Sequence, residues 1–149
     1  MIEKINYADY GLAKILSDLE FEIFGTNWQP EIILQKIIQN EFIYWIHTTN
    51  SKINAYVAVQ VIDDELHIIG IGVKEEFRNK NIARELMDSL LQFFLNKDYV
   101  CIRLEVRETN IAAINLYKSY LFQEYGVREN YYKNESAVLF ELRKLNAIR

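Results

Sequence analysis

The chain has 149 residues, of which 50% are hydrophobic and 26% are charged, a balance that excludes a mainly disordered protein and predicts one domain over residues 1–149. The 17 Lys and Arg residues against 21 Asp and Glu residues give a net charge of -4, which disfavours direct binding to nucleic acid. A single cysteine excludes an internal disulfide framework and a multi-cysteine metal site.

Hydrophobic residues at helical spacing predict two helices near the start of the chain. They are expected over Asp9–Phe24 and from Pro30 to about Gln39. Leu12, Leu16 and Leu19 recur on one stripe of the first helix, and Gly25 begins the break after it. Proline is favoured in the first turn of a helix, which places the second start at Pro30.

Three strand-like stretches follow, separated by short polar turns. They are expected at Phe42–His47, Asn54–Ile62 and Leu66–Val73, with turns at Thr48–Lys52 and Asp63–Glu65. Consecutive strands with such short turns predict an antiparallel meander.

The second half of the chain alternates helices and strands. The expected elements are helix Asn81–Leu95, strand Tyr99–Arg107, helix Asn110–Tyr120, and strands Phe122–Tyr132 and Ala137–Leu145. The strand–helix–strand run from Leu66 to Arg107 implies a right-handed crossover and one parallel pair in an otherwise antiparallel sheet. We therefore expect a mixed α/β domain.

The turn between Val73 and the next helix is a candidate phosphate site. A helix start exposes unpaired N–H groups and the positive end of its dipole, which suits a pyrophosphate. Arg78, Lys80 and Arg84 add positive charge beside it. An ordinary solvated helix start remains open at this point, because neither the dinucleotide glycine fingerprint nor the Walker pattern is present.

Three segments resemble a known family. Arg78-x-x-Asn81-x-Ala83 resembles the acetyl-CoA pyrophosphate loop of the GNAT acetyltransferase superfamily. The run from Leu104 to Tyr117 is similar to the Leu-Glu-Val-Arg to Leu-Tyr run of one branch, the ribosomal-protein-alanine N-acetyltransferases. Val127-Arg128-x-x-Tyr131-Tyr132 continues the match in phase, so that the resemblance covers about Leu66 to Tyr132.

The resemblance implies the α/β fold of the acyl-CoA N-acyltransferases. Its sheet is mixed and mostly antiparallel, with one splayed parallel strand pair and about four flanking helices. Acetyl-CoA is then the co-substrate, with no metal. The positions that match cofactor contacts are Ile71, Gly72, Val73, Arg78, Asn79, Lys80, Asn81, Ile82, Ala83, Arg84, Asn110 and Tyr117. Backbone N–H groups at Ile71–Val73 would hold the thioester oxygen, and those at Asn79–Arg84 the pyrophosphate.

Two positions depart from the family pattern by lacking glycine. Asn81 stands where the family has glycine, and asparagine is the residue other than glycine that best tolerates a left-handed backbone. Leu121-Phe122 stands where relatives have Gly-Phe.

Acetyl transfer to an amine requires a base for the nucleophile and an acid for the departing thiolate. Glu105 matches the base of this branch, although from spacing alone it also fits a solvated strand residue beside Arg103 and Arg107. Tyr117 matches the general acid, although an aromatic packing role fits it equally.

The remaining candidates have competing interpretations. Asn110 caps a helix and, by resemblance, also contacts CoA. Cys101 as a nucleophile would need a histidine partner, so a packed thiol fits better. Trp28, Tyr131 and Tyr132 either line the acceptor groove or only pack.

By resemblance we expect an Nα-acetyltransferase acting on the N-terminal alanine of a basic small-subunit ribosomal protein. Another amine (a different protein N-terminus, a polyamine or an aminoglycoside) and a catalytically decayed CoA-binding module remain alternatives. The sequence has no apolar run of the ~18 residues that a membrane helix needs and no signal peptide at Met1–Lys4, so we expect a cytoplasmic protein without membrane contact. We also expect a monomer or weak dimer.

Overall fold

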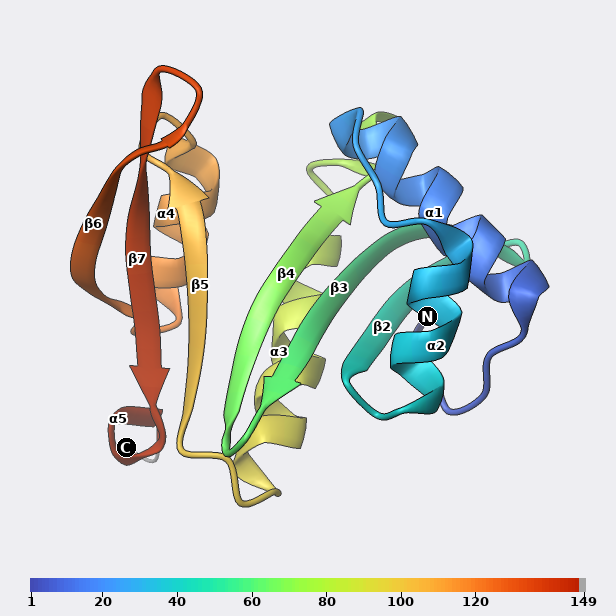
Figure 1. Ribbon diagram of the computed structural model, residues 1–149, viewed down its shortest axis with the longest axis horizontal. Coiled ribbons are helices and arrows are strands. Elements are labelled where there is room, and N and C mark those ends of the chain that lie inside the picture. Colours follow the sequence, from blue (N-terminus) through green and yellow to red (C-terminus); the bar gives the residue numbers. More distant parts are fainter. Residues whose placement is uncertain (148–149) are drawn as a thin grey trace. The chain divides into compact units, whose positions relative to one another are not determined.

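The computed structural model describes residues 1–147 (Figure 1). Its elements in chain order are β1 (Ile2–Lys4), α1 (Tyr10–Phe24), α2 (Pro30–Ile38), β2 (Phe42–Thr49), β3 (Lys52–Ile62), β4 (Glu65–Val73), the 3-10 turn η1 (Glu75–Phe77), α3 (Ile82–Leu95), β5 (Cys101–Arg107), α4 (Ile111–Ser119), β6 (Gln123–Tyr132), β7 (Glu135–Arg143) and α5 (Lys144–Ala147).

The strands form one mixed sheet in the order β1-β2-β3-β4-β5-β7-β6. Neighbours β2 and β3 are antiparallel, as are β5 and β7, and β7 and β6. The pair β4 and β5 is parallel, with Glu65 opposite Cys101 and His67 opposite Arg103. The predicted mixed α/β fold class, with its single crossover through α3, is confirmed.

The described chain divides into two compact units. The first contains residues 1–61 and 69–93, and the second contains residues 62–68 and 94–147. The prediction of a single domain over residues 1–149 stays a prediction.

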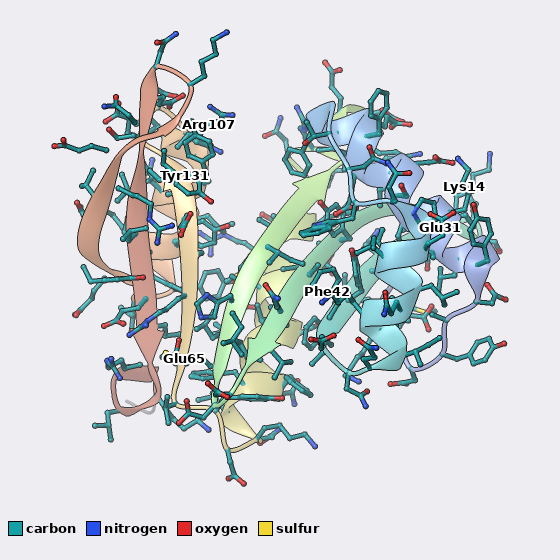
Figure 2. The ribbon with its side chains drawn as sticks, viewed as in Figure 1. Lys14, Glu31, Phe42, Glu65, Arg107 and Tyr131 are labelled. Atoms are coloured by element: carbon teal, nitrogen blue, oxygen red, sulfur yellow. The ribbon has the colours of Figure 1, made fainter. Side chains whose placement is uncertain are left out.

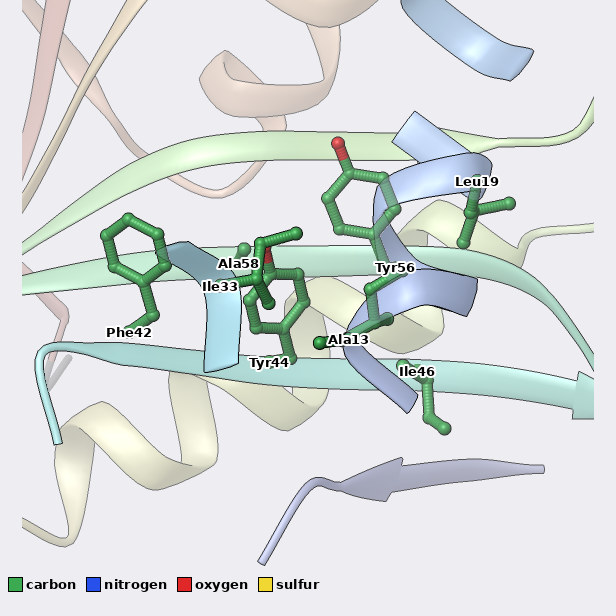
Figure 3. Close-up of a cluster of buried hydrophobic side chains, with 9 residues drawn as sticks. Ala13, Leu19, Ile33, Phe42, Tyr44, Ile46, Tyr56 and Ala58 are labelled. Atoms are coloured by element: carbon green, nitrogen blue, oxygen red, sulfur yellow. The ribbon is translucent and has the colours of Figure 1, made fainter. Parts of the chain in front are cut away.

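The core of the first unit lies between the helices α1 and α2 and the strands β2 and β3 (Figure 3). The nine buried residues are Ala13, Leu16, Leu19, Ile33, Phe42, Tyr44, Ile46, Tyr56 and Ala58. Helix α1 is bounded by two local signals. The Asp9 side chain accepts the Leu12 N–H at 2.9 Å, and Gly25 ends the helix with φ of 76°.

The second unit packs α4 against one face of its strands. Alternate residues of β5 face opposite sides, so Leu104 and Val106 are buried while Glu105 points to the other side. Phe140 is paired with Leu104 across the sheet and lies 6.5 Å from Tyr117, measured between ring centroids. Helix α4 therefore covers the face that carries Leu104.

The structure corrects several predicted boundaries. The first hairpin is tighter than expected, because Asn50 and Ser51 both have positive φ (52° and 64°) and form a two-residue turn. Strands β2 and β3 are correspondingly longer than predicted. Glu65 belongs to β4 rather than to the turn, and β7 begins at Glu135.

Other differences concern short elements. Strand β1 was missed because its three residues carry no periodic pattern, although they pair with Trp45–His47. Lys144 and Leu145 were expected at the end of the last strand and instead belong to α5. Strands β5 and β6 begin at Cys101 and Gln123, slightly later than predicted.

Candidate active site

The end of β4, where the thioester site was expected, lies in the first unit and contains two closely approached glycines. A Cβ on Gly70 would lie 2.7 Å from the Tyr56 hydroxyl oxygen, and Figure 3 shows that hydroxyl directed toward β4. A Cβ on Gly72 would lie 3.0 Å from side-chain atoms of Ile23 and Phe24. A side chain at Gly70 would thus displace the buried Tyr56, and one at Gly72 would require Ile23 and Phe24 to shift by a few tenths of an ångström, a packing constraint separate from the expected approach of a ligand.

The loop before α3 has the backbone conformation that an anion site needs. Asn79 and Asn81 both have φ of 63°, in the left-handed region. Asn81 does not begin the helix as predicted but precedes it, and its carbonyl accepts the Glu85 N–H at 3.1 Å. A left-handed residue followed by a helical one turns successive N–H groups toward one side, which forms an anion-binding nest.

The charged side chains of this loop have different surroundings. The Arg78 Nε donates to the Val73 carbonyl at 3.0 Å, so this arginine ties the loop to the end of β4. The Lys80 ammonium lies 5.5 Å from the centroid of the Phe77 ring. Arg84 is exposed in the first turn of α3. The positive charge and the N–H groups at this helix start together fit a diphosphate.

In the second unit, Glu105 is the centre of a polar cluster. Its Oε1 lies 3.1 Å from the Arg128 guanidinium, and its side chain is 29% exposed. The Tyr131 hydroxyl donates to the Glu105 carboxylate, and this hydrogen bond raises the pKa of Tyr131. Tyr131 and Tyr132 meet edge to face at 5.0 Å, so the structure brings Glu105, Tyr131 and Tyr132 together.

The Arg107 end of β5 carries a second set of contacts. The Arg107 guanidinium stacks 4.0 Å from the Tyr132 ring centroid and pairs with Glu135 at 3.2 Å. Thr109 donates to Glu135 through its backbone N–H and its hydroxyl. Figure 2 shows Arg107 and Tyr131 near each other at this end of the unit. These contacts fix the strand end beside Glu105.

Tyr117 lies on the other side of β5 from Glu105. It is 4% exposed and packs on Phe122 and Phe140. Burial raises its pKa, so the phenol is neutral at physiological pH. Asn110 accepts the Ala113 N–H at 3.2 Å and caps α4, as expected.

Trp28 belongs to the first unit, in the connection between α1 and α2. The residue is 44% exposed, with its ring edge-on to Phe42 at 5.5 Å between centroids. The backbone carbonyl of Trp28 accepts a hydrogen bond from the Ser17 hydroxyl at 2.7 Å.

Cys101, the residue considered as a nucleophile, has no environment that would activate its thiol. Cys101 is fully buried, and burial raises the pKa of its thiol, which disfavours the reactive thiolate. A ring nitrogen of His47 is 2.7 Å from the Asn54 side-chain oxygen, and one of His67 is 3.0 Å from Glu65.

Among residues 1–147 no cluster of His, Cys, Asp and Glu could hold a metal ion. No helix in that range is both long and apolar enough to span a membrane.

Sequence reasoning missed the partners of these residues. Arg128 was noted only as part of a motif, yet it pairs with the candidate base. Glu20 was not singled out, although a carboxylate between Leu16 and Ile23 on the apolar stripe of a helix was the available signal. The predicted cofactor loop and Trp28 lie in the first unit, while Glu105, Asn110, Tyr117, Tyr131 and Tyr132 lie in the second.

Comparison with known proteins decides the family. The model of the acetyltransferase (GNAT) family matches residues 10–121. This chain belongs to the GNAT acetyltransferase family. A ribosomal protein bS18-alanine N-acetyltransferase of Salmonella typhimurium is 33% identical to this GNAT chain over 99 residues, which cover 64% of this chain and 67% of the relative.

Solved structures have the same fold as this GNAT protein. The crystal structure of the ribosomal-protein-S18-alanine N-acetyltransferase from Escherichia coli matches with a TM-score of 0.80 and 25% identity, covering 96% of this chain and 94% of that chain. Arabidopsis thaliana NAA60 in complex with acetyl-CoA matches with a TM-score of 0.78 at 18% identity, covering 96% and 97% of the two chains. The protein is thus an acetyl-CoA-dependent N-acetyltransferase.

Proposed function

We propose that this acetyltransferase acts on the α-amino group of a protein N-terminus, in the cytoplasm, with the N-terminal alanine of a small-subunit ribosomal protein as the acceptor. The observation that carries this proposal is the similarity to two acetyltransferases named for that reaction, at 33% identity in sequence and with a TM-score of 0.80 in structure. The Leu104–Tyr117 run, which carries the proposed catalytic groups, supports the same branch.

Glu105 is the proposed base. An α-amino group has a pKa of about 8, so at neutral pH most of it is protonated and cannot attack a thioester. A carboxylate can accept the amine proton directly or through one water molecule. Glu105 is partly exposed and oriented by Arg128 and Tyr131, which suits a group that must meet a substrate from solution.

Tyr117 is the proposed acid. The amine nitrogen bonds to the thioester carbonyl carbon, the carbon–sulfur bond breaks, and the thiolate takes a proton from the phenol. Because Glu105 and Tyr117 lie on opposite faces of β5, both can reach one thioester only at an edge of that strand. Strand β7 pairs with one edge from Cys101 to Arg107, and β4 pairs with the other edge only as far as Arg103, so the proposal assigns the thioester to that second edge beyond Arg103.

The first unit supplies the proposed cofactor contacts. The left-handed residues Asn79 and Asn81 and the start of α3 would hold the diphosphate, with Arg84 adding charge. Ile71–Val73 would supply the N–H group that holds the thioester oxygen. Trp28, Tyr131 and Tyr132 are the proposed acceptor contacts, and Glu105 adds the negative charge that suits a basic N-terminal peptide.

The test is an acetylation assay with synthetic peptides. Purified protein with acetyl-CoA and a peptide that begins with alanine should release free CoA thiol and add one acetyl group to the peptide α-amine, measured by mass spectrometry. The same peptide with a blocked α-amine should be inert. Transfer to a polyamine or an aminoglycoside, with none to the peptide, would establish the alternative acceptor class. Intact mass measurement of ribosomal proteins from a strain without this gene then identifies the natural acceptor.

A further inference from the structure

Helix α1 holds the backbone of Trp28 through a chain of partly buried hydrogen bonds. The Asn27 side-chain amide donates to the Ser17 hydroxyl oxygen at 2.6 Å, and that hydroxyl donates to the Trp28 carbonyl at 2.7 Å. Ser17 is only 1% exposed. Hydrogen bonds arranged in series polarise one another, so this chain fixes the Trp28 carbonyl more firmly than one exposed bond would.

Glu20 lies one turn further along the same face of α1. It is 5% exposed, and its carboxyl is close enough to the Trp28 backbone amide for that amide to stabilise the ionised form. Its Oε2 is 3.5 Å from the Tyr56 hydroxyl, and its Oε1 has no hydrogen-bond partner among residues 1–147. Ser17 therefore hydrogen-bonds the Trp28 carbonyl, while the Glu20 carboxyl lies near the backbone amide of the same residue.

A carboxyl in this place is costly for the fold. Its neighbours on α1 include Leu16 and Leu19, and Tyr44 nearby also has a buried hydroxyl without a partner. Burying a polar group with an unpaired oxygen destabilises a protein, and a leucine here would extend the core. A residue retained at such a cost suggests a role beyond packing.

The Trp28 side chain is presented differently from its backbone. The backbone is held by α1, while Trp28 as a whole remains 44% exposed and its ring packs edge-on against Phe42. A half-exposed aromatic ring on a fixed loop is typical of a residue that contacts a ligand, because little conformational entropy is lost on binding.

We propose that Ser17 and Glu20 are positioning residues that hold Trp28 in the place from which its indole binds the acceptor. The two side chains do not touch the acceptor and act only through the Trp28 backbone. This inference rests on the proposed function, in which Trp28 contacts the acceptor peptide.

The first measurement is independent of any acceptor. The sequence has two tryptophans, and Trp45 is 3% exposed, so iodide quenching of fluorescence reports on Trp28. Ser17→Ala and Glu20→Leu should both change the quenching constant, because the loop is released. Glu20→Gln should behave like the native protein, since its side-chain oxygen can take the same place beside the Trp28 backbone amide and the Tyr56 hydroxyl. Thr49→Val is the matched control, because it removes a hydrogen bond that Asn54 donates at 2.9 Å, at the opposite end of β2 from Phe42.

The second measurement is steady-state kinetics with the alanine peptide. Ser17→Ala and Glu20→Leu should raise the KM for the peptide about three- to tenfold, which corresponds to one lost hydrogen bond, and leave kcat and the KM for acetyl-CoA nearly unchanged. Glu20→Gln and Thr49→Val should leave the peptide KM within about twofold of the native value.

Each outcome decides the inference. Unchanged quenching in both Ser17→Ala and Glu20→Leu would show that these residues do not fix the position of Trp28 and would overturn the inference. Changed quenching with an unchanged peptide KM would overturn its part in acceptor binding, as would an equal rise of KM in Thr49→Val. Absence of peptide acetylation by the native protein would instead reject the proposed acceptor. The quenching series would still decide whether α1 holds Trp28, and its link to a peptide acceptor would then be rejected as well.

Discussion

The Glu105 carboxylate and the Arg128 guanidinium lie 3.1 Å apart although their strands are not neighbours. Strand β7 lies between β5 and β6, so the ion pair spans it. Arg128 is 55% exposed, which limits the energy of the pair, but the contact sets the direction in which the carboxylate points.

Replacement of Glu105 tests its role as the base. Glu105→Gln keeps the size of the side chain but cannot take the amine proton, so acetylation of the alanine peptide should fall about 100- to 10,000-fold. The loss should shrink at high pH, where more of the amine is already neutral. Acetyl-CoA binding by calorimetry should be nearly intact, and Glu129→Gln on the exposed part of β6 is the control. Near-normal rates from pH 6 to 9 would leave Glu105 a solvated strand residue.

Tyr117→Phe separates catalysis from packing. The ring stays against Phe122 and Phe140 while only the hydroxyl is lost, so turnover should fall with little change in Tm or in acetyl-CoA affinity. Tyr132→Phe, which also removes a phenol hydroxyl, provides a comparison for loss of an acceptor contact. If turnover of Tyr117→Phe equals that of the native protein and its Tm drops, the residue serves packing alone.

Charge reversal at the start of α3 tests the diphosphate site. Arg84→Glu should weaken acetyl-CoA much more than a truncated pantetheine thioester, because only the full cofactor carries the diphosphate. Direct binding of both ligands is the measurement. Lys97→Glu, just after the end of the same helix, is the control for a change in net charge. Equal losses for the two ligands would show that this helix start does not contact phosphate.

The two positions that lack the family glycine should respond differently to its restoration. Leu121 has φ of 70° and an exposed side chain, so Leu121→Gly should raise the free energy of unfolding by up to about 1 kcal/mol. Asparagine tolerates φ of 63° better, so Asn81→Gly should change stability by less than about 0.5 kcal/mol and leave acetyl-CoA affinity equal or tighter. Urea unfolding of both variants measures the difference, and a destabilised Leu121→Gly would contradict it.

Burial raises the pKa of Glu20 from 4.5 to about 7, which makes stability depend on pH. Below pH 4.5 Glu20 is protonated in both the folded and the unfolded state, and its contribution to the free energy of unfolding is fully present. Between pH 4.5 and about 7 Glu20 ionises in the unfolded chain but stays protonated in the folded state. The free energy of unfolding therefore falls by up to about 3 kcal/mol over this range. Glutamine does not ionise, so the Tm of Glu20→Gln should exceed that of the native protein by a margin that widens from pH 5 to 8. Exposed Glu31→Gln is the control and should show no such widening.

Local signals explain what the sequence could predict. Gly25, Pro30 and the apolar stripe of α1 act over one or two turns, so helix positions were correct to within a residue or two. The crossover through α3 could be predicted from the succession of strand, helix and strand along the sequence. The insertion of β7 between β5 and β6 did not, because strand order depends on pairing between distant segments.

Candidate site residues could be proposed only where a motif carried them. Glu105, Tyr117 and Asn81 were proposed from their neighbouring residues, and the positive φ at Asn81 fits the glycine that the family has at that position. Arg128 and Glu20 contact residues that are far away in the chain, at Glu105 and Tyr56. No local pattern reports such pairs, so only the folded structure reveals them.

The division of the first unit into two chain segments has a consequence during synthesis. All nine residues of its core cluster lie before residue 59, but residues 69–93 belong to the same unit and leave the ribosome later. At about 5–20 residues per second, Gly70 is synthesised roughly 1–2 seconds after Ala58, and only then can strand β4 bring it to Tyr56. During that interval the apolar residues of α1, β2 and β3 lack part of their cover.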